Sequence, residues 1–316
     1  MQTLVLFPDA EGLAGAAALL AAGELVAMPT ETVYGLAGDA RNARAVARIY
    51  EAKGRPSFNP LIVHLPDLEA AERIAHFDAP ARALAQAFWP GALTLVLPLR
   101  QDAGIAGLVT AGHDTVAIRV PAHPAAQALL RAFGEPLAAP SANPSGRISP
   151  TTAGHVADPD TGLGGRIAAV LDAGPCAVGV ESTIIGWDAG RPMLLRPGGI
   201  AAEAVAAVLG RAPVPPALHD RAPNSPGQLS SHYAPRASLR LEALGARPGE
   251  VLIGFGPVAG EMTLSASGDL AEAAARLFDL LRQADALGRP IAVAPVPGHG
   301  LGAAINDRLR RAAAPR

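Results

Sequence analysis

Short apolar runs that end at Pro, Gly or Asn alternate with helix-like stretches along most of this chain, and this alternation restricts its fold most strongly. The strand-like runs before residue 200 are TLVLF, GELVAMPT, LIVHL, ALTLVLPL, TVAIRVP, PLAAPSAN, RIAAVLDAG and STIIGW. Helices are predicted for an Ala-rich stretch after the first run and for NARAVARIYEAKG, HPAAQALLRAFG and IAAEAVAAVLG. Asn42 is suited to begin the second of these helices and Gly54 to end it. The alternation predicts an α/β fold with a mixed, largely buried sheet.

The pattern changes over residues 211–236, where RAPVPPALHDRAPNSPGQLSSHYAP is dense in proline and lacks apolar periodicity. This stretch is predicted to be a linker between a larger domain, residues 1–210, and a smaller one, residues 237–316. The smaller domain contains EVLIGFG, GDLAEAAARLFDLLRQADALG, RPIAVAPVP and GLGAAINDRLRRAA. Their order of strand, helix, strand, helix predicts a Rossmann-like α/β domain. GFGPVAG does not form a dinucleotide fingerprint, because its third glycine is misplaced and Pro257 follows the second.

Composition excludes several classes of protein. Hydrophobic residues make up 50% and charged residues 17% of the 316 residues, which is typical of a globular chain and not of a disordered one. The apolar runs are far shorter than the roughly 20 residues that cross a bilayer, and MQTLVLFPDAEG lacks the basic start of a signal peptide, so we expect a cytoplasmic protein without membrane contact. A formal net charge of −2 argues against extensive coating of nucleic acid. The single Cys176 excludes an internal disulfide and a paired-cysteine metal site.

Lys53 is the only lysine among 26 Lys and Arg residues, and it stands in the polar stretch KGRPSFNPL, which we expect to be a loop. The Arg-rich composition is typical of a GC-rich genome. A lysine kept against that bias suggests that the position needs a flexible ammonium and not a planar guanidinium. Chance retention is the alternative.

Polar clusters stand at the ends of several predicted strands. PTETVYGL carries three hydroxyls and Glu31, and KGRPSFNPLIVH combines Arg55 and Asn59 with a strand that ends at His64. Arg119 lies in the apolar strand TVAIRVP, where an unpaired guanidinium is costly, so we expect it to have an anionic partner. APSANPSGRISPT is a Gly- and Pro-rich loop with hydroxyls and amides suited to phosphate, and GVESTIIG and LLRPGG add further polar groups.

Each cluster also has a structural explanation. Ser/Asn/Pro segments are usually turns, an arginine in a strand is usually paired with a structural carboxylate, and a histidine such as His64 is usually a hydrogen-bonded core residue. No Walker A, HExxH or GxSxG sequence is present. Taken together, the clusters supply cations and hydroxyl donors with few spare carboxylates, which favours an anionic, phosphorylated ligand.

Seven motifs occur in an order and spacing that match a known family: PTETVYGLAGDA, KGRPSFNPLIVH, WPGALTLVL, AIRVPAHP, PLAAPSANPSGRISPT, GVESTIIGW and LLRPGG. They resemble the YrdC-type threonylcarbamoyl-AMP synthases, and SPGQLSSHYAP with the tail domain resembles the long, two-domain form. The resemblance implies a YrdC-like twisted mixed sheet with flanking helices over residues 1–210. It also implies synthesis of L-threonylcarbamoyladenylate from L-threonine, bicarbonate and ATP, with release of pyrophosphate, for tRNA modification beside the anticodon.

The resemblance also implies the site residues. ATP would be held by Lys53, Arg55, Asn59, Thr115, Ser141, Ser149, Arg196 and Tyr233, with Lys53 and Arg55 catalytic through their charges on the phosphates. Threonine would be held by Thr32, His64, Arg119, the backbone around Ala139, and Ser182. Mg²⁺ would bridge the ATP phosphates and be bound mostly through nucleotide and water. The implied partners are a downstream threonylcarbamoyl-transferase complex and, transiently, tRNA.

In one place the chain departs from the family pattern: Ser230 and Ser231 stand where family linkers often carry an aromatic and a basic residue before the His-Tyr pair. The resemblance implies that Tyr233 reaches back over the nucleotide, so residues 211–236 are predicted to act as a lid. Two alternatives remain at this point: a non-catalytic RNA-binding module of the same fold, and a carbamoyltransferase-type maturation factor. The second needs zinc-binding cysteines that this chain does not have.

Overall fold

The computed structural model describes residues 2–215 and 232–315. Within these ranges, ten strands form one sheet. In spatial order they are β1 (Leu4–Leu6), β8 (Ala169–Leu171), β2 (Val26–Met28), β3 (Gly35–Asp39), β7 (Leu137–Ala138), β4 (Ile62–His64), β6 (Thr115–Arg119), β5 (Leu93–Pro98), β9 (Thr183–Asp188) and β10 (Arg191–Arg196). The pairs β1–β8, β8–β2, β4–β6 and β5–β9 are parallel and the other pairs antiparallel, so the predicted mixed sheet is confirmed.

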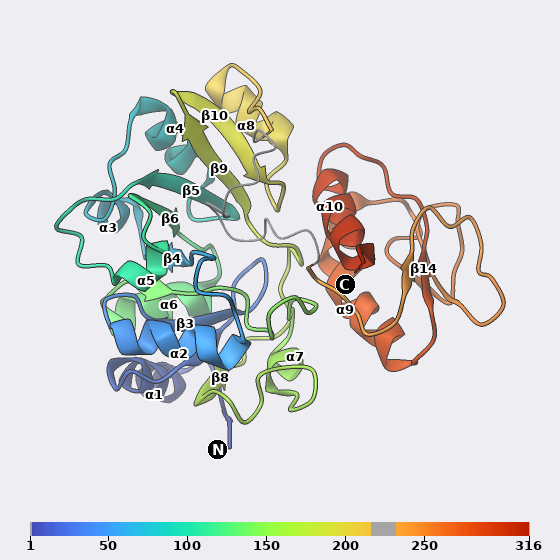
Figure 1. Ribbon diagram of the computed structural model, residues 1–316, viewed down its shortest axis with the longest axis horizontal. Coiled ribbons are helices and arrows are strands. Elements are labelled where there is room, and N and C mark those ends of the chain that lie inside the picture. The colour runs from blue at the N-terminus through green and yellow to red at the C-terminus, as the bar shows by residue number, and fades with distance from the viewer. Residues whose placement is uncertain (1, 216–231, 316) are drawn as a thin grey trace.

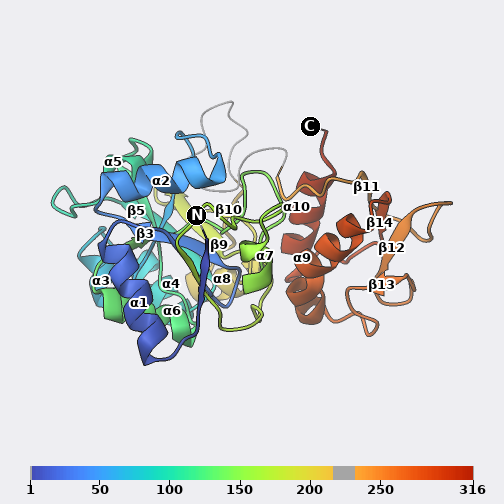
Figure 2. The ribbon, with the colours of Figure 1, turned by 90° about the horizontal axis from the view of Figure 1, so that it is seen from below.

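Helices flank this sheet, and several of them pack in pairs. They are α1 (Ala10–Ala21), α2 (Ala43–Lys53), α3 (Leu68–Glu72), α4 (Ala79–Phe88), α5 (Gly107–Thr110), α6 (Pro124–Phe133), α7 (Ala153–Ala157) and α8 (Ala202–Leu209). Helix α1 packs on α6, α2 on α5, and α4 on α8. Figure 2 shows α2 and α5 on one side and α1 and α6 on the other. The core between these layers is aliphatic and Ala-rich, and β2 and β4 are buried along their whole length.

Helix α2 begins and ends where the sequence predicts. The Asn42 side chain accepts hydrogen bonds from the backbone N–H groups of Arg44 and Ala45, and Gly54 follows the helix in the left-handed region at φ 59°. The expected loop position of Lys53 is wrong, because Lys53 is the last residue of α2. The helix continues to Lys53 because Gly54 ends it, and the polar residues that follow Gly54 do not.

The second sheet is small and parallel, with the order β11 (Leu239–Arg240), β14 (Ile291–Val293), β12 (Val251–Gly254) and β13 (Met262–Thr263). Helices α9 (Leu270–Ala286) and α10 (Gly302–Ala313) lie between this sheet and the larger part of the molecule (Figures 1 and 2). The predicted smaller α/β domain is therefore confirmed.

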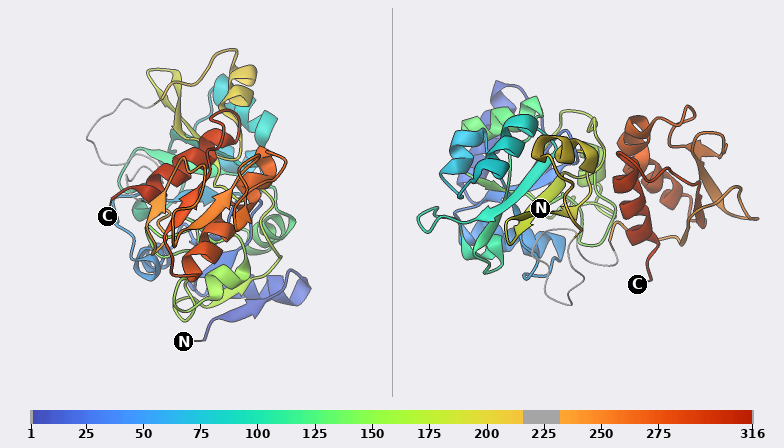
Figure 3. Two further views of the ribbon diagram at one scale, coloured as in Figure 1. Left: turned by 90° about the vertical axis from the view of Figure 1, so that its right-hand side faces the viewer. Right: turned by 90° about the horizontal axis from the view of Figure 1, so that it is seen from above.

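The two parts share a hydrophobic core. Val33, Ile148 and Val180 of the larger part belong to the same buried cluster as Tyr233 and Phe278, and Phe278 lies on α9. Figure 3 shows the helical side of the small domain turned toward the larger part. Gly179, at φ 75°, packs so closely on α9 that an added Cβ would lie 2.3 Å from the carbonyl oxygen of Ala274. This dense packing fixes how the small domain meets the surface that carries the site.

The predicted linker is only partly described. Val214, near its beginning, pairs with the edge strand β10 through hydrogen bonds with Pro192 and Leu194. Residues 216–231, which include Ser230 and Ser231, lie outside the described residues. The boundaries at 210/211 and 236/237 stay a prediction. Among the described residues, no helix combines the length and apolarity that a bilayer crossing requires.

Candidate active site

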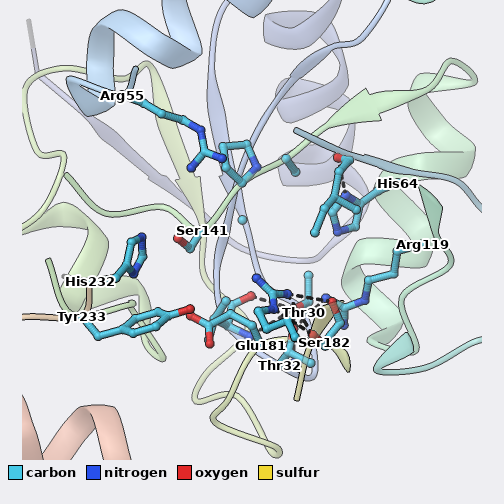
Figure 4. Close-up of a pocket in the computed structure, with 16 residues that line it drawn as sticks. Thr30, Thr32, Arg55, His64, Arg119, Ser141, Glu181, Ser182, His232 and Tyr233 are labelled. Atoms are coloured by element: carbon cyan, nitrogen blue, oxygen red, sulfur yellow. Dashed lines mark hydrogen bonds between the residues drawn. The ribbon is translucent and has the colours of Figure 1, made fainter. Parts of the chain in front are cut away.

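A cavity that is partly open to solvent lies between the large sheet and the segment that enters the small domain. Short strands deliver many of its side chains: Thr30 and Thr32 follow β2, His64 ends β4, Arg119 ends β6, Ala139 follows β7, Ser182 precedes β9 and Arg196 ends β10. Its other lining residues are Val33, Gly35, Arg55, Ile62, Pro140, Ser141, Glu181, His232 and Tyr233. Figure 4 shows His64 and Arg119 on one side of the cavity, opposite Arg55, His232 and Tyr233.

Arg119 forms the first end of the cavity. It is buried, and its Nη2 lies 2.6 Å from Glu31 Oε1, its Nη1 donates to Thr32 Oγ1 at 2.8 Å, and its Nε donates to the Gly91 carbonyl at 3.2 Å. The expectation that Arg119 needs an anionic partner is confirmed, and Glu31 is that partner. A guanidinium has five N–H groups, and these bonds use three of those of Arg119. The described residues take no more of them, so two are left for a ligand.

Two further polar groups stand beside Arg119. The hydroxyls of Thr30 and Thr32 lie 2.8 Å apart, and both side chains are buried. His64 is also buried, with Nδ1 3.2 Å from the Ile62 carbonyl oxygen. Burial and the nearby charge of Arg119 lower the pKa of His64 to about 3. His64 is therefore neutral near pH 7 and can exchange a hydrogen bond with a ligand without adding charge.

Two more arginines form the opposite end. Arg55 donates from Nε to the Asn59 carbonyl and from Nη2 to the Pro60 carbonyl, at 3.1 and 2.9 Å. Arg196 donates from Nε and Nη2 to the Ser182 carbonyl, at 3.1 and 2.9 Å. Within the described chain neither guanidinium has a carboxylate within ion-pair distance. Burial, together with the charge of Arg196, lowers the pKa of Arg55 to about 10. Two cations held by neutral carbonyls make this end a site for an anion.

Lys53 lies behind this end and is not among the described residues that line the cavity. It is 3% exposed, and its Nζ donates to the carbonyl oxygens of Ser141 and Asn143 at 2.5 Å each. Burial, and then the charge of Arg55, lowers the pKa of Lys53 well below its usual range. The predicted mobile ammonium is thus held in place here, where it fixes the loop that presents Ser141.

Glu181 lies between the two ends. Its Oε1 accepts a hydrogen bond from Ser149 Oγ at 2.5 Å, and the next residue, Ser182, has its hydroxyl 2.6 Å from that of Thr94. Burial alone would raise the pKa of Glu181, but Arg308, Arg196 and the Ser149 hydroxyl together lower it, so the carboxylate is charged. Glu181 belongs to the motif GVESTIIG, but its ordinary neighbours in the sequence give no signal for its role here.

His232 and Tyr233 close the cavity from the side of the small domain. Both are buried, their rings lie 4.1 Å apart, and Tyr233 stacks on Phe278 with ring centroids 5.5 Å apart. Tyr233 has φ 62°, a left-handed conformation that few non-glycine residues adopt. The His-Tyr pair is therefore held by the small domain while its side chains face the cavity.

The cavity brings together most of the predicted site residues: Arg55, Ser141, Arg196, Tyr233, Thr32, His64, Arg119, Ala139 and Ser182. Four others lie elsewhere, and Lys53, behind the end with Arg55 and Arg196, is one of them. Asn59 and Ser149 are buried beside the cavity. Thr115 lines a neighbouring hollow with Val96 and Leu195. An apolar cluster of Ile62, Ala117, Ile184 and Leu195 links the two spaces, since Ile62 lines the cavity and Leu195 the hollow.

Comparison with known proteins assigns the chain to a class. Residues 18–198 match the Sua5/YciO/YrdC family, which is described as telomere recombination, and the chain belongs to this family. Residues 200–314 match the threonylcarbamoyl-AMP synthase C-terminal domain, so the chain has the two-domain form.

The relatives cover almost the whole chain. The threonylcarbamoyl-AMP synthase of Bacillus subtilis is 46% identical over 96% of this chain and 93% of its own length. The crystal structure of P. abyssi Sua5 complexed with L-threonine is 37% identical, with a TM-score of 0.89 and coverage of 99% of this chain and 98% of that one. A variant of the same archaeal protein, in which an adjacent His and Tyr are replaced by alanine, is 36% identical, with a TM-score of 0.88 and coverage of 98% and 96%.

Proposed function

We propose that this chain is an enzyme that synthesises L-threonylcarbamoyladenylate from L-threonine, bicarbonate and ATP and releases pyrophosphate, for the threonylcarbamoyl modification of tRNA. Family membership and the names of the full-length relatives support this activity, and so does the L-threonine complex of the archaeal structure. The observation in this chain that carries the proposal is the cavity with two cationic ends, Arg119 at one and Arg55 with Arg196 at the other.

Threonine is assigned to the Arg119 end. The two N–H groups that Arg119 has left can take the substrate carboxylate, with Glu31 holding the guanidinium in position. The hydroxyls of Thr32 and Ser182, the neutral His64 ring and the backbone at Ala139 are placed to bind the substrate hydroxyl and amine. A small polar substrate held on all sides in this way loses much of its rotational freedom before reaction.

ATP is assigned to the opposite end. Arg55, Arg196 and Ser141 face the phosphates, and Lys53 and Ser149 support them from behind. The apolar cluster of Ile62, Ala117, Ile184 and Leu195 offers a surface for the base and leads to the hollow where Thr115 lies. Tyr233, which stacks on the small domain, covers the nucleotide in this proposal. The lid predicted for residues 211–236 falls largely on residues 216–231, which lie outside the described residues.

Magnesium accompanies ATP in this proposal. Asn59 Oδ1 is buried and has no hydrogen-bond partner among the described residues, and an amide oxygen is a ligand that Mg²⁺ accepts. Asn59 would hold the ion, with nucleotide and water supplying the other ligands. The ion would offset negative charge on the phosphates and on the leaving pyrophosphate.

The chemistry follows from these positions. The threonine amine and bicarbonate give the carbamate and water, a carbamate oxygen then forms a bond to the α-phosphorus, and the bond from that phosphorus to the pyrophosphate oxygen breaks. The enzyme contributes positioning and charge neutralisation. Arg55 and Arg196 stabilise charge that grows on the leaving group, while Arg119 keeps the carboxylate away from the reacting phosphorus.

Omission of single substrates tests the activity. Pyrophosphate release should require threonine, bicarbonate and ATP together, and loss of any one should abolish it. Release that depends on carbamoyl phosphate would favour the carbamoyltransferase alternative, and no release together with RNA binding would favour the RNA-binding module.

Threonine analogues test the first end of the cavity. Replacement by 2-aminobutyrate, which lacks the hydroxyl, should lower kcat/KM by up to about 10⁴-fold, because buried donors lose their partner. Serine lacks only a methyl group and should lose about 10- to 200-fold. Equal use of 2-aminobutyrate and threonine would contradict the assignment of this end.

The remaining parts of the proposal concern the surroundings of the reaction. Adenylates hydrolyse readily, so the product should pass directly to a threonylcarbamoyl-transferase complex, with tRNA bound here at most transiently. The protein is proposed to act in the cytoplasm.

A further inference from the structure

Arg308 crosses from the small domain into the larger one. It lies on α10 and is fully buried, with Nε 2.9 Å from Glu181 Oε2 and Nη1 donating to the Pro197 carbonyl oxygen at 2.5 Å. The guanidinium carbon lies 5.4 Å from the centre of the Tyr233 ring. A fully buried arginine at a domain junction is costly unless it is paired. Arg308 pairs with two carboxylates, Glu181 and, at 3.2 Å, Asp307, and of these Glu181 faces the cavity.

Glu181 connects this arginine to the ATP end. One of its oxygens accepts from Arg308 and the other accepts from Ser149, so both are used. Among the described residues that line the cavity, Glu181 is the only one with a carboxylate. Without a counter-charge, a buried carboxylate in this position would repel a triphosphate strongly.

The charges around the cavity fall into two sets. At one end Glu31 is paired with Arg119, which also lowers the pKa of His64. At the other end burial raises the pKa of Glu181, whereas the charges of Arg308 and Arg196 lower it. The charge of Glu181 in turn raises the pKa of Lys53. Glu181 lies between the two ends, and its hydrogen bond from Ser149 connects the Arg308–Glu181 pair to the ATP end.

We propose that Arg308 is a positioning residue for ATP: it neutralises Glu181 and keeps Ser149 in place, so that docking of the small domain makes the cavity competent for a triphosphate. This inference rests on the proposed function, since it takes ATP as the ligand of that end. It assigns the small domain a direct part in substrate binding, through one guanidinium.

Arg308→Met in the full chain is the first test. ATP should bind at least about tenfold more weakly, by equilibrium titration and as KM, while KM for threonine changes by less than about twofold. Arg310→Met is the matched control, because Arg310 is exposed on the same helix, and it should leave both constants unchanged. Titration of ATP does not depend on turnover, so a wild-type protein that binds ATP but releases no pyrophosphate would refute the proposed reaction without touching this inference.

Glu181→Gln added to Arg308→Met separates charge from docking. The amide oxygen still accepts from Ser149 while the uncompensated charge is gone, so ATP affinity should return to within about threefold of Glu181→Gln alone. If Arg308 only holds the domains together, the double variant will stay as weak as Arg308→Met, and the proposal fails.

Arg308→Lys keeps the charge and therefore does not leave Glu181 unpaired, which protects the test from simple misfolding. ATP affinity should stay within about threefold of wild type. A tenfold loss in this variant, or an equal loss of threonine and ATP affinity in Arg308→Met, would overturn the proposal.

Discussion

Lys53 shows how one side chain can serve a site without facing it. Its ammonium is buried and has two carbonyl acceptors, on Ser141 and Asn143 of one loop, so its removal affects both the local charge and the position of Ser141. These bonds use two of the three donors of an ammonium and hold it fixed. Fixed donors of this kind act mainly on charge that develops in the transition state.

Replacement of Lys53 should therefore lower kcat far more than threonine affinity. We expect Lys53→Ala to reduce pyrophosphate release by about 10² or more, with threonine KM changed by less than about threefold. Lys53→Arg should also be impaired, because a larger planar guanidinium does not fit the buried space of an ammonium. Ser57→Ala, in the exposed part of the next loop, is the control. Wild-type release by Lys53→Arg would refute the role assigned to the ammonium.

Two buried histidines should make stability depend on pH. Burial is the main cause that lowers the pKa of both His64 and His232, to about 3 in each case, whereas an unfolded histidine has a pKa of about 6.5. Between these values the unfolded chain binds protons that the folded chain does not. The free energy of unfolding therefore falls as the pH falls from about 6.5 toward 3, by up to about 1.4 kcal/mol per pH unit for each histidine.

Urea unfolding between pH 6.5 and 5, where few carboxylates titrate, measures this slope. His64→Gln and His232→Gln should each lower the number of protons taken up on unfolding, and with it the slope, by up to one. Slopes identical to wild type in both buried variants would show that these rings are protonated in the folded protein.

At the scale of elements, short strands place the site residues, and the sequence predicts some of these strands better than others. Strands β4, β6 and β9 were predicted because they are apolar runs of β-branched residues. The sequence does not predict β3, since GLAGD holds two glycines. It indicates β10 only by its end, LLRPGG, because RPMLLR begins with Arg and a Pro that is typical of edge strands. Both become strands only because neighbouring strands supply hydrogen-bond partners.

The same limit applies to the site. Arg119 could be singled out from the sequence because one charge in an apolar strand needs a partner. Glu181 and Arg308 could not be paired, because 127 residues separate them and each has ordinary neighbours in the sequence. Thr115 was assigned from the family pattern, and the structure places it in the neighbouring hollow instead of the cavity. Local pattern thus predicts the groups on single elements, and packing between domains decides which of them meet.

The start of β9 is held by one glycine. A Cβ on Gly198 would lie 2.3 Å from the Glu181 carbonyl oxygen and equally close to backbone atoms of Ser182 and Thr183. Gly198→Ala should therefore displace this backbone, weaken both ATP and threonine binding by about tenfold or more, and lower Tm. Gly107→Ala is the control, since no described heavy atom lies within 4 Å of its added Cβ. Unchanged constants in Gly198→Ala would show that the backbone adapts without cost to the site.

At the scale of the whole molecule, the site is complete only where the two domains meet. The larger domain supplies the sheet edges and the three arginines of the cavity, whereas the small domain supplies Arg308 and the surface on which Tyr233 stacks. The core that contains Phe278 includes side chains of both domains, so separation would expose apolar surface as well as break the Arg308–Glu181 pair. Domain docking and substrate binding are therefore coupled.

Gly179 offers a way to weaken this docking without changing any charge. Gly179→Ala would place a Cβ 2.3 Å from the Ala274 carbonyl oxygen and 2.4 Å from the Ala275 Cα, both backbone atoms of α9 that cannot move alone. The small domain should shift outward and withdraw Arg308 from Glu181. We expect a larger radius of gyration in small-angle scattering and ATP affinity lowered by about tenfold.

The left-handed backbone at Gly179 adds a strain of about 1–2 kcal/mol for any other residue, so a control must carry the same strain without the clash. Gly134→Ala does so, because Gly134 has φ 79° and no described heavy atom within 4 Å of an added Cβ, against φ 75° at Gly179. Both variants should lose a similar amount of stability from strain, but only Gly179→Ala should lose ATP affinity. Equal ATP affinity in the two variants would mean that the cavity binds its nucleotide without close docking of the small domain.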